Sequence, residues 1–163
     1  AERRRARRAT GRIAQPGEWR HGDVRDERTL FAELAADERE VVGRKSFAID
    51  PATPDEAAAD MEQLDYDFWL FRDLASDAEA LIEHLPDGGY RLQRMRAVAE
   101  EAGPVAIDLT VVTDTVPTAT LDEAIAQLDD SGLRRLFFVD ADTERGNVVY
   151  RRYDGHYGVL SPL

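Results

Sequence analysis

The feature that most constrains this chain is a pattern that occurs twice, an Asp-Gly pair followed two residues later by tyrosine. It lies in ALIEHLPDGGYRL (residues 80–92) and in NVVYRRYDGHYGVL (residues 147–160). The two Asp-Gly pairs are 67 residues apart, and this spacing also aligns the preceding residues without a gap. The identical pairs are Ala52/Ala119, Thr53/Thr120, Asp55/Asp122, Glu56/Glu123, Ala57/Ala124, Ala59/Ala126, Phe71/Phe138, Asp73/Asp140, Asp87/Asp154, Gly88/Gly155 and Tyr90/Tyr157. A register kept over such a length indicates an internal duplication.

In each copy a threonine precedes an apolar helical stripe, with a glutamate three residues after it, which predicts a capped helix. Runs rich in β-branched and aromatic residues predict strands around each helix. The expected strands include 41–49, 68–71 and 80–85 in the first copy, and 107–113, 134–139 and 147–153 in the second. The sequence therefore predicts an α+β fold of two β-α-β-β-β repeats. The expected boundaries are a basic flexible linker at 1–28, a first repeat with a leading helix at 29–100, and a second repeat at 101–163.

The Asp-Gly pairs predict two tight hairpins. Asp-Gly favours a type I′ turn, in which both central residues have positive φ. Strand alternation in the second hairpin places Val148 and Tyr150 on one face and Val149 and Arg151 on the other. Both faces carry apolar residues, so we expect this hairpin to be at least half buried.

A unit of about 55 residues is close to the lower limit for folding alone. Its small sheet would also leave an open edge and an uncovered apolar face. We therefore expect the two repeats to pack as an intramolecular pseudo-two-fold dimer. FWLF and LFF are apolar on both strand faces, which is typical of strands buried on both sides, with Phe71 and Phe138 in the core. The expected interface residues are Phe68, Trp69, Phe71, Phe137, Phe138, Val149, Tyr150 and Tyr157.

Charge is unevenly distributed along the chain. The net charge is −12, but residues 1–28 hold nine arginines and five acids, a balance of +4. Residues 29–163 therefore carry 12 basic and 28 acidic groups, a balance of −16. Because so acidic a body is repelled by a phosphate backbone, we expect it to bind protein and not nucleic acid directly. The arginine-rich opening, which begins with alanine, is interpreted as the end of a linker from a preceding domain.

The same residues resemble the C-terminal domain of long-form ribosome hibernation promoting factors, the sigma-54 modulation protein family. The matching residues at the front of that pattern are Phe47, Pro51, Glu56, Ala57, Met61, Phe68 and Phe71. Those at its back are Val149, Tyr150, Arg151, Arg152, Asp154, Gly155, Tyr157, Gly158 and Pro162. The first copy departs from the family's Tyr-Arg-Arg with Glu83, His84 and Leu85, and the second has Arg135 where the family has phenylalanine.

The resemblance implies a non-enzymatic, cytoplasmic translation regulator that associates with the ribosome in dormancy or stress. It further implies an N-terminal domain, absent from this sequence, that binds the small ribosomal subunit. In the family the C-terminal domain is a single copy that homodimerises and joins two ribosomes. Because this chain has two copies, we hypothesise that they satisfy each other and favour single ribosomes, although a homodimer is also possible.

A second interpretation comes from the second copy alone. VTDTVPTATLDEAIAQLDDSGLRRLFFVDADTERGNVV resembles a cystathionine-β-synthase-type module, and paired modules of that kind bind adenine nucleotides. Thr120, Asp140 and Asp142 would then be ligand contacts. Against it, such a module continues into another helix, whereas here the chain continues into YRRYDGHYGVL.

An enzyme is the least favoured class. The three histidines, His21, His84 and His156, do not correspond between the copies, and the acidic pairs lack metal-site spacing with a histidine. There is no cysteine, no phosphate-binding glycine loop and no nucleophile elbow. No apolar run is long enough to span a membrane. We expect no catalytic residue, no cofactor, no metal and no membrane partner.

Overall fold

The computed structural model of the protein describes residues 39–47 and 49–162; the linker expected at 1–28 and the leading helix lie outside them. The described residues form two helices and ten strands in two mixed sheets, which confirms the α+β class. The first elements are β1 (Val41–Phe47), β2 (Pro51–Ala52), α3 (Pro54–Leu64), β3 (Phe68–Asp73), β4 (Ala78–His84) and β5 (Tyr90–Arg94). The next are β6 (Leu109–Val111), β7 (Thr118–Ala119), α4 (Leu121–Ser131), β8 (Arg135–Asp140), β9 (Gly146–Arg151) and β10 (Tyr157–Pro162).

Both helices begin at the predicted capping boxes. The hydroxyl of Thr53 accepts from the backbone N–H of Glu56 at 3.2 Å, and the Glu56 carboxylate accepts from the backbone N–H of Thr53 at 3.2 Å. Thr120 and Glu123 make the same two contacts at 3.2 Å. Each box satisfies N–H groups that the first helical turn leaves without an intrahelical partner, so the sequence fixes where both helices start.

The strands form two five-stranded sheets with corresponding orders. We name them after their central strands: the β4 sheet has the order β2-β3-β4-β5-β6, and the β9 sheet has the order β7-β8-β9-β10-β1. Neighbouring strands pair parallel, antiparallel, antiparallel and parallel along both orders. We call residues 41–95 the first segment and residues 108–162 the second segment.

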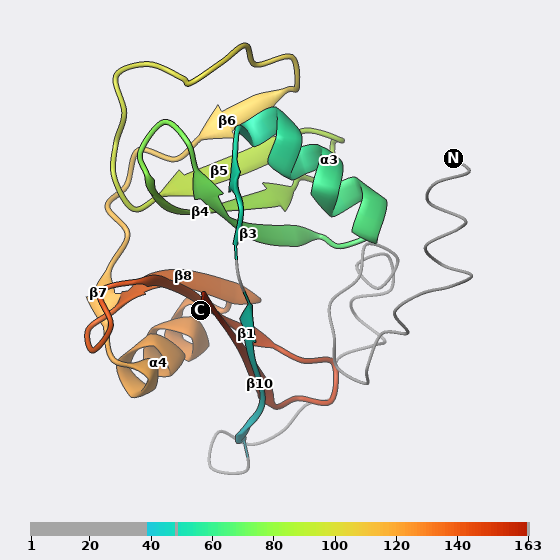
Figure 1. Cartoon of the computed structure of the whole chain (residues 1–163). Coiled ribbons are helices and arrows are strands. Elements are labelled where there is room, and N and C mark those ends of the chain that lie inside the picture. Colours follow the sequence, from blue (N-terminus) through green and yellow to red (C-terminus); the bar gives the residue numbers. More distant parts are fainter. Residues whose placement is uncertain (1–38, 48, 163) are drawn as a thin grey trace.

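Each sheet receives one outer strand from the other segment. β1 belongs to the first segment but pairs with β10, whereas β6 belongs to the second segment but pairs with β5. Figure 1 shows the chain running beside β10 as β1 and then crossing to the β4 sheet. Because both outer strands are exchanged, neither sheet is complete without residues from both segments.

The layers follow the order helix, sheet, sheet, helix (Figure 1). Around α3 the β4 sheet packs a core that includes Met61, Phe71 and Ile82. Around α4 the β9 sheet packs a core that includes Leu128 and Phe138. A third apolar cluster lies between the two sheets, so each sheet is buried on both faces.

The two hairpins differ from the predicted type I′ turn. Only the glycine of each Asp-Gly pair has positive φ, with Gly88 at 93° and Gly155 at 91°. The Leu85 carbonyl accepts from Gly88 N–H at 3.0 Å, and Leu85 N–H donates to the Gly89 carbonyl at 2.8 Å. This is the three-residue loop in which a type I turn precedes a left-handed residue. In the first hairpin the prediction was wrong because Pro86, with φ held near −65°, suits the first central position of a type I turn; the second hairpin forms the same loop with Tyr153 at that position.

The connector between the segments is held by a buried ion group. Arg94, on β5, donates to Asp73 at 2.8 Å and to Glu101 in the connector at 2.9 Å. The side chain of Asp73 is 0% exposed and that of Arg94 is 5% exposed. These contacts attach the connector to the β4 sheet, and residues 97–104 of the connector contain no helix or strand.

Candidate functional site: the surface between the sheets

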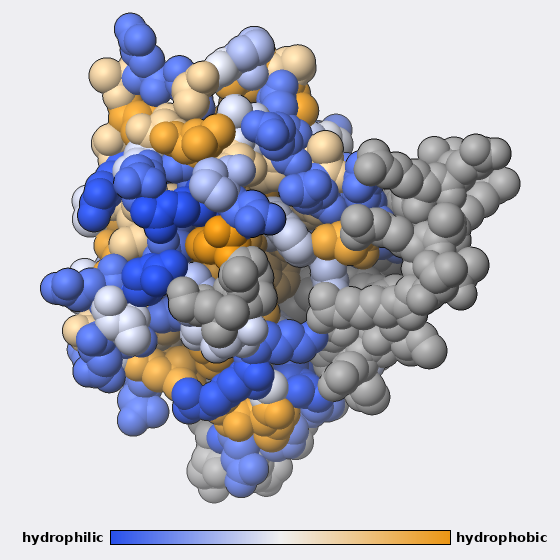
Figure 2. Space-filling model, viewed as in Figure 1, coloured by the Kyte–Doolittle hydropathy of each residue, from blue (hydrophilic) through white to orange (hydrophobic). Residues whose placement is uncertain are grey.

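The centre of the surface between the sheets is apolar. β3 and β4 contribute Phe68, Leu70 and Leu81 from one side, and the β9 sheet contributes Phe137, Val148 and Tyr150 from the other. Leu81 and Val148 are 0% exposed. On the face seen in Figure 2, apolar atoms occur as small separate groups among polar ones. The apolar side chains of this cluster are therefore buried between the two sheets.

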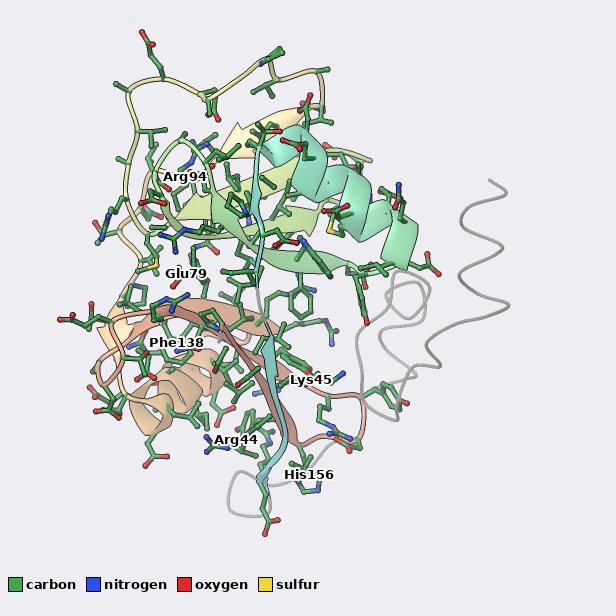
Figure 3. The ribbon with its side chains drawn as sticks, in the orientation of Figure 1. Arg44, Lys45, Glu79, Arg94, Phe138 and His156 are labelled. Atoms are coloured by element: carbon green, nitrogen blue, oxygen red, sulfur yellow. The ribbon has the colours of Figure 1, made fainter. Side chains whose placement is uncertain are left out.

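One end of this surface holds a buried glutamate. Glu79 Oε1 accepts from Arg145 Nε at 2.8 Å and from the Gly146 N–H at 2.8 Å. Arg72 lies 3.8 Å from the other carboxylate oxygen, and the Glu79 side chain is only 3% exposed. A Cβ atom added to Gly146 would meet the Glu79 Cβ at 2.7 Å. Glu79 is labelled in Figure 3 between the two sheets. Its side chain occupies a space that is open only because residue 146 is glycine.

The other end holds a second buried glutamate with a similar pair of arginines. Glu83 accepts from Arg91 at 2.9 Å, within the β4 sheet, and from Arg135 of the other segment at 3.2 Å. The guanidinium of Arg135 also lies 4.8 Å from the centroid of the Phe68 ring. The ring of Tyr150 packs 5.6 Å from the same phenylalanine. Each end therefore joins the sheets through one glutamate and one arginine of the opposite segment.

Burial shifts the pKa of Arg135. Removal from water lowers the pKa of its guanidinium, and the neighbouring carboxylates of Glu83 and Asp67 oppose that shift. Arginine stays protonated despite such a shift, so its charge must be matched inside the protein. Glu83 is thus a required partner, since a buried charge without one is strongly destabilising.

Two further polar clusters attach the helices to the outer faces of the two sheets. In the first segment Tyr90 donates to Glu62 at 3.0 Å, and His84 contacts the same carboxylate. Burial, with the contact to Glu62, raises the pKa of Tyr90 to about 12. These residues attach the last strand of the segment to its helix, at the tyrosine that follows the Asp-Gly turn.

The second segment repeats that arrangement with a stronger set of charges. Tyr157 donates to Asp129 at 2.7 Å, Arg151 donates to it at 2.9 Å, and Arg39 donates at 3.0 Å. Burial raises the pKa of Asp129, but these hydrogen bonds and positive charges outweigh it and hold the pKa below its ordinary value. Tyr157 and Arg151 of the repeated motif therefore stabilise the fold around α4.

The expected interface residues divide between three places. Phe68, Phe137 and Tyr150 lie in the cluster between the sheets. Trp69 and Phe71 pack with the α3 core, and Phe138, Val149 and Tyr157 pack with the α4 core. The predicted alternation of the second hairpin is confirmed, since Val148 and Tyr150 face the other sheet while Val149 faces α4.

Sequence reasoning did not find the buried charges. Glu79 and Glu83 lie in AEALIEH, where two glutamates at alternate positions of an apolar strand would normally indicate a solvated face. A signal was present: Glu83 and Arg135 are each a departure from the family pattern, and they contact each other at 3.2 Å. Gly146, in a strand, was a second signal of close approach.

The residues of the nucleotide-binding interpretation have local structural partners. Thr120 caps α4, and Asp140 accepts from the backbone N–H of Asp142 at 3.1 Å and from the Thr143 hydroxyl at 3.2 Å. No group of three or more potential metal ligands occurs within residues 39–47 and 49–162. Among the same residues, no helix is long and apolar enough to cross a membrane.

Comparison with known proteins identifies the family. A family model described as sigma 54 modulation/S30EA ribosomal protein C terminus matches residues 36–92 and 111–159. The two matches together cover more than half of the chain, which therefore belongs to the family of sigma 54 modulation/S30EA ribosomal protein C-terminal domains. The second match covers the stretch on which the cystathionine-β-synthase interpretation rested, and that interpretation has no support.

The similar proteins include two regulators. The chain is 34% identical over 129 residues to the dormancy associated translation inhibitor of Mycobacterium tuberculosis, covering 75% of this chain and 47% of that protein. It is 46% identical over 41 residues to the ribosome hibernation promotion factor of Bacillus subtilis, covering 25% of this chain and 22% of that protein. The chain therefore spans at most about half the length of these relatives.

Proposed function

We propose that the two segments are copies of one unit that pack about a pseudo-two-fold axis. The main support for this proposal is that equivalent positions, 67 residues apart in the sequence, face each other across the surface between the sheets. Gly146 is the equivalent of Glu79, and its backbone N–H donates to the Glu79 carboxylate. Arg135 is the equivalent of Phe68, and its guanidinium lies over the Phe68 ring. A two-fold interface brings equivalent positions together in this way. Residues 29–100 and 101–163 are thus two repeats of one pseudo-dimer.

On this basis the chain is a ribosome-associated translation regulator of the hibernation type. The supporting evidence is its family and its similarity to a translation inhibitor and a hibernation factor. The protein acts without catalysis or a cofactor, in the cytoplasm. Binding to the small subunit resides mainly in an N-terminal domain, while this acidic region makes protein contacts.

The fused pair also sets the outcome on the ribosome. A single-copy domain must find a second chain to cover its sheet, and that second chain can carry a second ribosome. Here the corresponding surface is filled by the other segment, with Leu81 and Val148 fully buried. The protein therefore holds single ribosomes and does not join them in pairs.

Sedimentation of ribosomes tests this function. The protein that carries this chain, mixed with ribosomes and centrifuged through sucrose, should travel with the single-ribosome peak and inhibit translation. The ribosome hibernation promotion factor of B. subtilis, centrifuged in parallel, is the comparison protein. Ribosome dimers formed with this protein would contradict the proposal, and failure to bind or inhibit ribosomes would contradict the regulator function itself.

A further inference from the structure

The surface between the sheets differs between the segments in a complementary way. Several interface positions hold unlike residues at the 67-residue spacing, and some of these residues contact each other across the surface. In one set, the first segment has Phe68, Glu83 and Arg91, whereas the second has Arg135, Tyr150 and Gly158. Glu83 pairs with Arg91 on the neighbouring strand, and Tyr150 pairs with Gly158 in the same register.

The glycine of this set is required by the tyrosine. A Cβ atom on Gly158 would lie 2.3 Å from the Tyr150 ring, so a side chain at that position would displace the ring. In the first segment the equivalent position holds Arg91, which donates to Glu83 at 2.9 Å. Each segment is thus internally consistent, with an arginine beside glutamate or a glycine beside tyrosine.

We propose that these differences form a recognition code, by which the face of the first segment accepts the face of the second and neither accepts a copy of itself. The inference deepens the proposed function and rests on its internal pairing. Two first-segment faces would bring Glu79 against Glu79 at the axis. Each Glu83 would also lack its second arginine, which in this structure is Arg135 at 3.2 Å. Two second-segment faces would bring Arg135 against Arg135 without a glutamate. The first pairing places like charges together at Glu79 and leaves each Glu83 with one arginine instead of two, and the second buries two arginines without a glutamate; both are unfavourable.

The code also decides which partner this chain can accept. A second copy of the chain could pair only by exchanging complete segments, first with second. The short connector between the segments gives the internal pairing a much higher effective concentration. The buried surface therefore selects the chain's own second segment, and a protein offering only a first-type face is rejected.

Exchanging residues between the segments of the whole protein tests the code. One variant gives both segments the first-segment residues, R135F/Y150E/G158R, and a second gives both the second-segment residues, F68R/E83Y/R91G. A third carries all six substitutions, which restores one set of each kind in exchanged positions while Glu79 and Gly146 stay unchanged. The urea midpoint of unfolding is measured for each, with circular dichroism as the signal.

The code predicts that the six-residue variant is more stable than both three-residue variants, each of which should lose on the order of 1 M in midpoint. Independent effects would add, making the six-residue variant the least stable, and this result would overturn the proposal. If a three-residue variant does not fold, folding of the six-residue variant supports the code and its failure to fold refutes it. The exposed pair Asp60 and Gln127 is the control, since D60Q, Q127D and D60Q/Q127D should leave the midpoint unchanged.

This result is separate from the ribosome experiment. The cycle measures only how the two faces match, so it succeeds or fails whether or not the protein holds single ribosomes. Conversely, ribosome dimers observed with a fully complementary interface would refute the proposed function and leave the code intact.

Discussion

Replacing Glu79 tests the buried charges between the sheets most sharply. Its carboxylate accepts two hydrogen bonds at 2.8 Å, from Arg145 Nε and from Gly146 N–H, and its side chain is 3% exposed. Glu79→Ala leaves the buried Gly146 N–H without an acceptor, which costs about 1–3 kcal/mol. The Arg145 side chain is 36% exposed and can turn to water, so its lost contact adds only about 1 kcal/mol.

We therefore expect Glu79→Ala to lower the free energy of unfolding by about 3 kcal/mol, a large share of the 5–15 kcal/mol typical of a domain. Glu79→Gln keeps an amide oxygen for Gly146 and should lose about 1–2 kcal/mol. Glu100→Ala removes the same charge at an exposed position and should change stability by less than about 0.5 kcal/mol.

Urea unfolding followed by circular dichroism measures all three variants. The expected order of stability is wild type and Glu100→Ala together, then Glu79→Gln, then Glu79→Ala. If Glu79→Ala unfolds at the same urea concentration as Glu100→Ala, the Glu79 carboxylate does not hold the sheets together and the reasoning is refuted.

Three other predictions concern the cores and the caps. Phe71→Asp or Phe138→Asp should abolish the cooperative unfolding transition, because each ring is 2% exposed and an unpaired carboxylate there costs several kcal/mol; Leu133→Asp, at 49% exposure, should retain it. The raised pKa of Tyr90 means that folding favours its neutral form, so its contribution is complete below its ordinary pKa of 10.0 and is lost as pH rises towards about 12. The stability of wild type relative to Tyr90→Phe should therefore fall across that range in urea titrations, and a constant difference would show that Tyr90 is not protected. Thr120→Ala should lower the free energy of unfolding by about 1 kcal/mol, measured by thermal melting, and an unchanged melting temperature would mean that the capping box is dispensable.

Local signals in the sequence predicted most of the elements. The capping boxes at Thr53 and Thr120 located both helix starts, and the 67-residue register gave corresponding strands. The exchange of β1 and β6 was not predicted, because two segments that align at the 67-residue spacing offer β1 two corresponding neighbours, β5 and β10. Which one it pairs with depends on tertiary contacts that no local pattern contains.

The sequence alone does not assign the buried aromatic residues to one face of a sheet, for a related reason. Consecutive strand residues point to opposite faces, so Phe137 and Phe138 cannot both face the other sheet. Of this pair, Phe137 packs between the sheets and Phe138 packs on α4. The apolar pattern identified both phenylalanines as buried, but only the position of the helix decides which of them faces the helix and which faces the other sheet. The burial of Glu79 and Glu83 was not predicted because one arginine partner of each, Arg145 or Arg135, comes from the other segment.

The molar mass of this chain in solution tests the central claim most directly. Light scattering during size-exclusion chromatography, repeated over a hundredfold range of concentration, should give the 18.3 kDa of one chain throughout. Internal pairing predicts this value, because the apolar surface between the sheets is already filled. A mass that rises to twice that of one chain as concentration increases would contradict it.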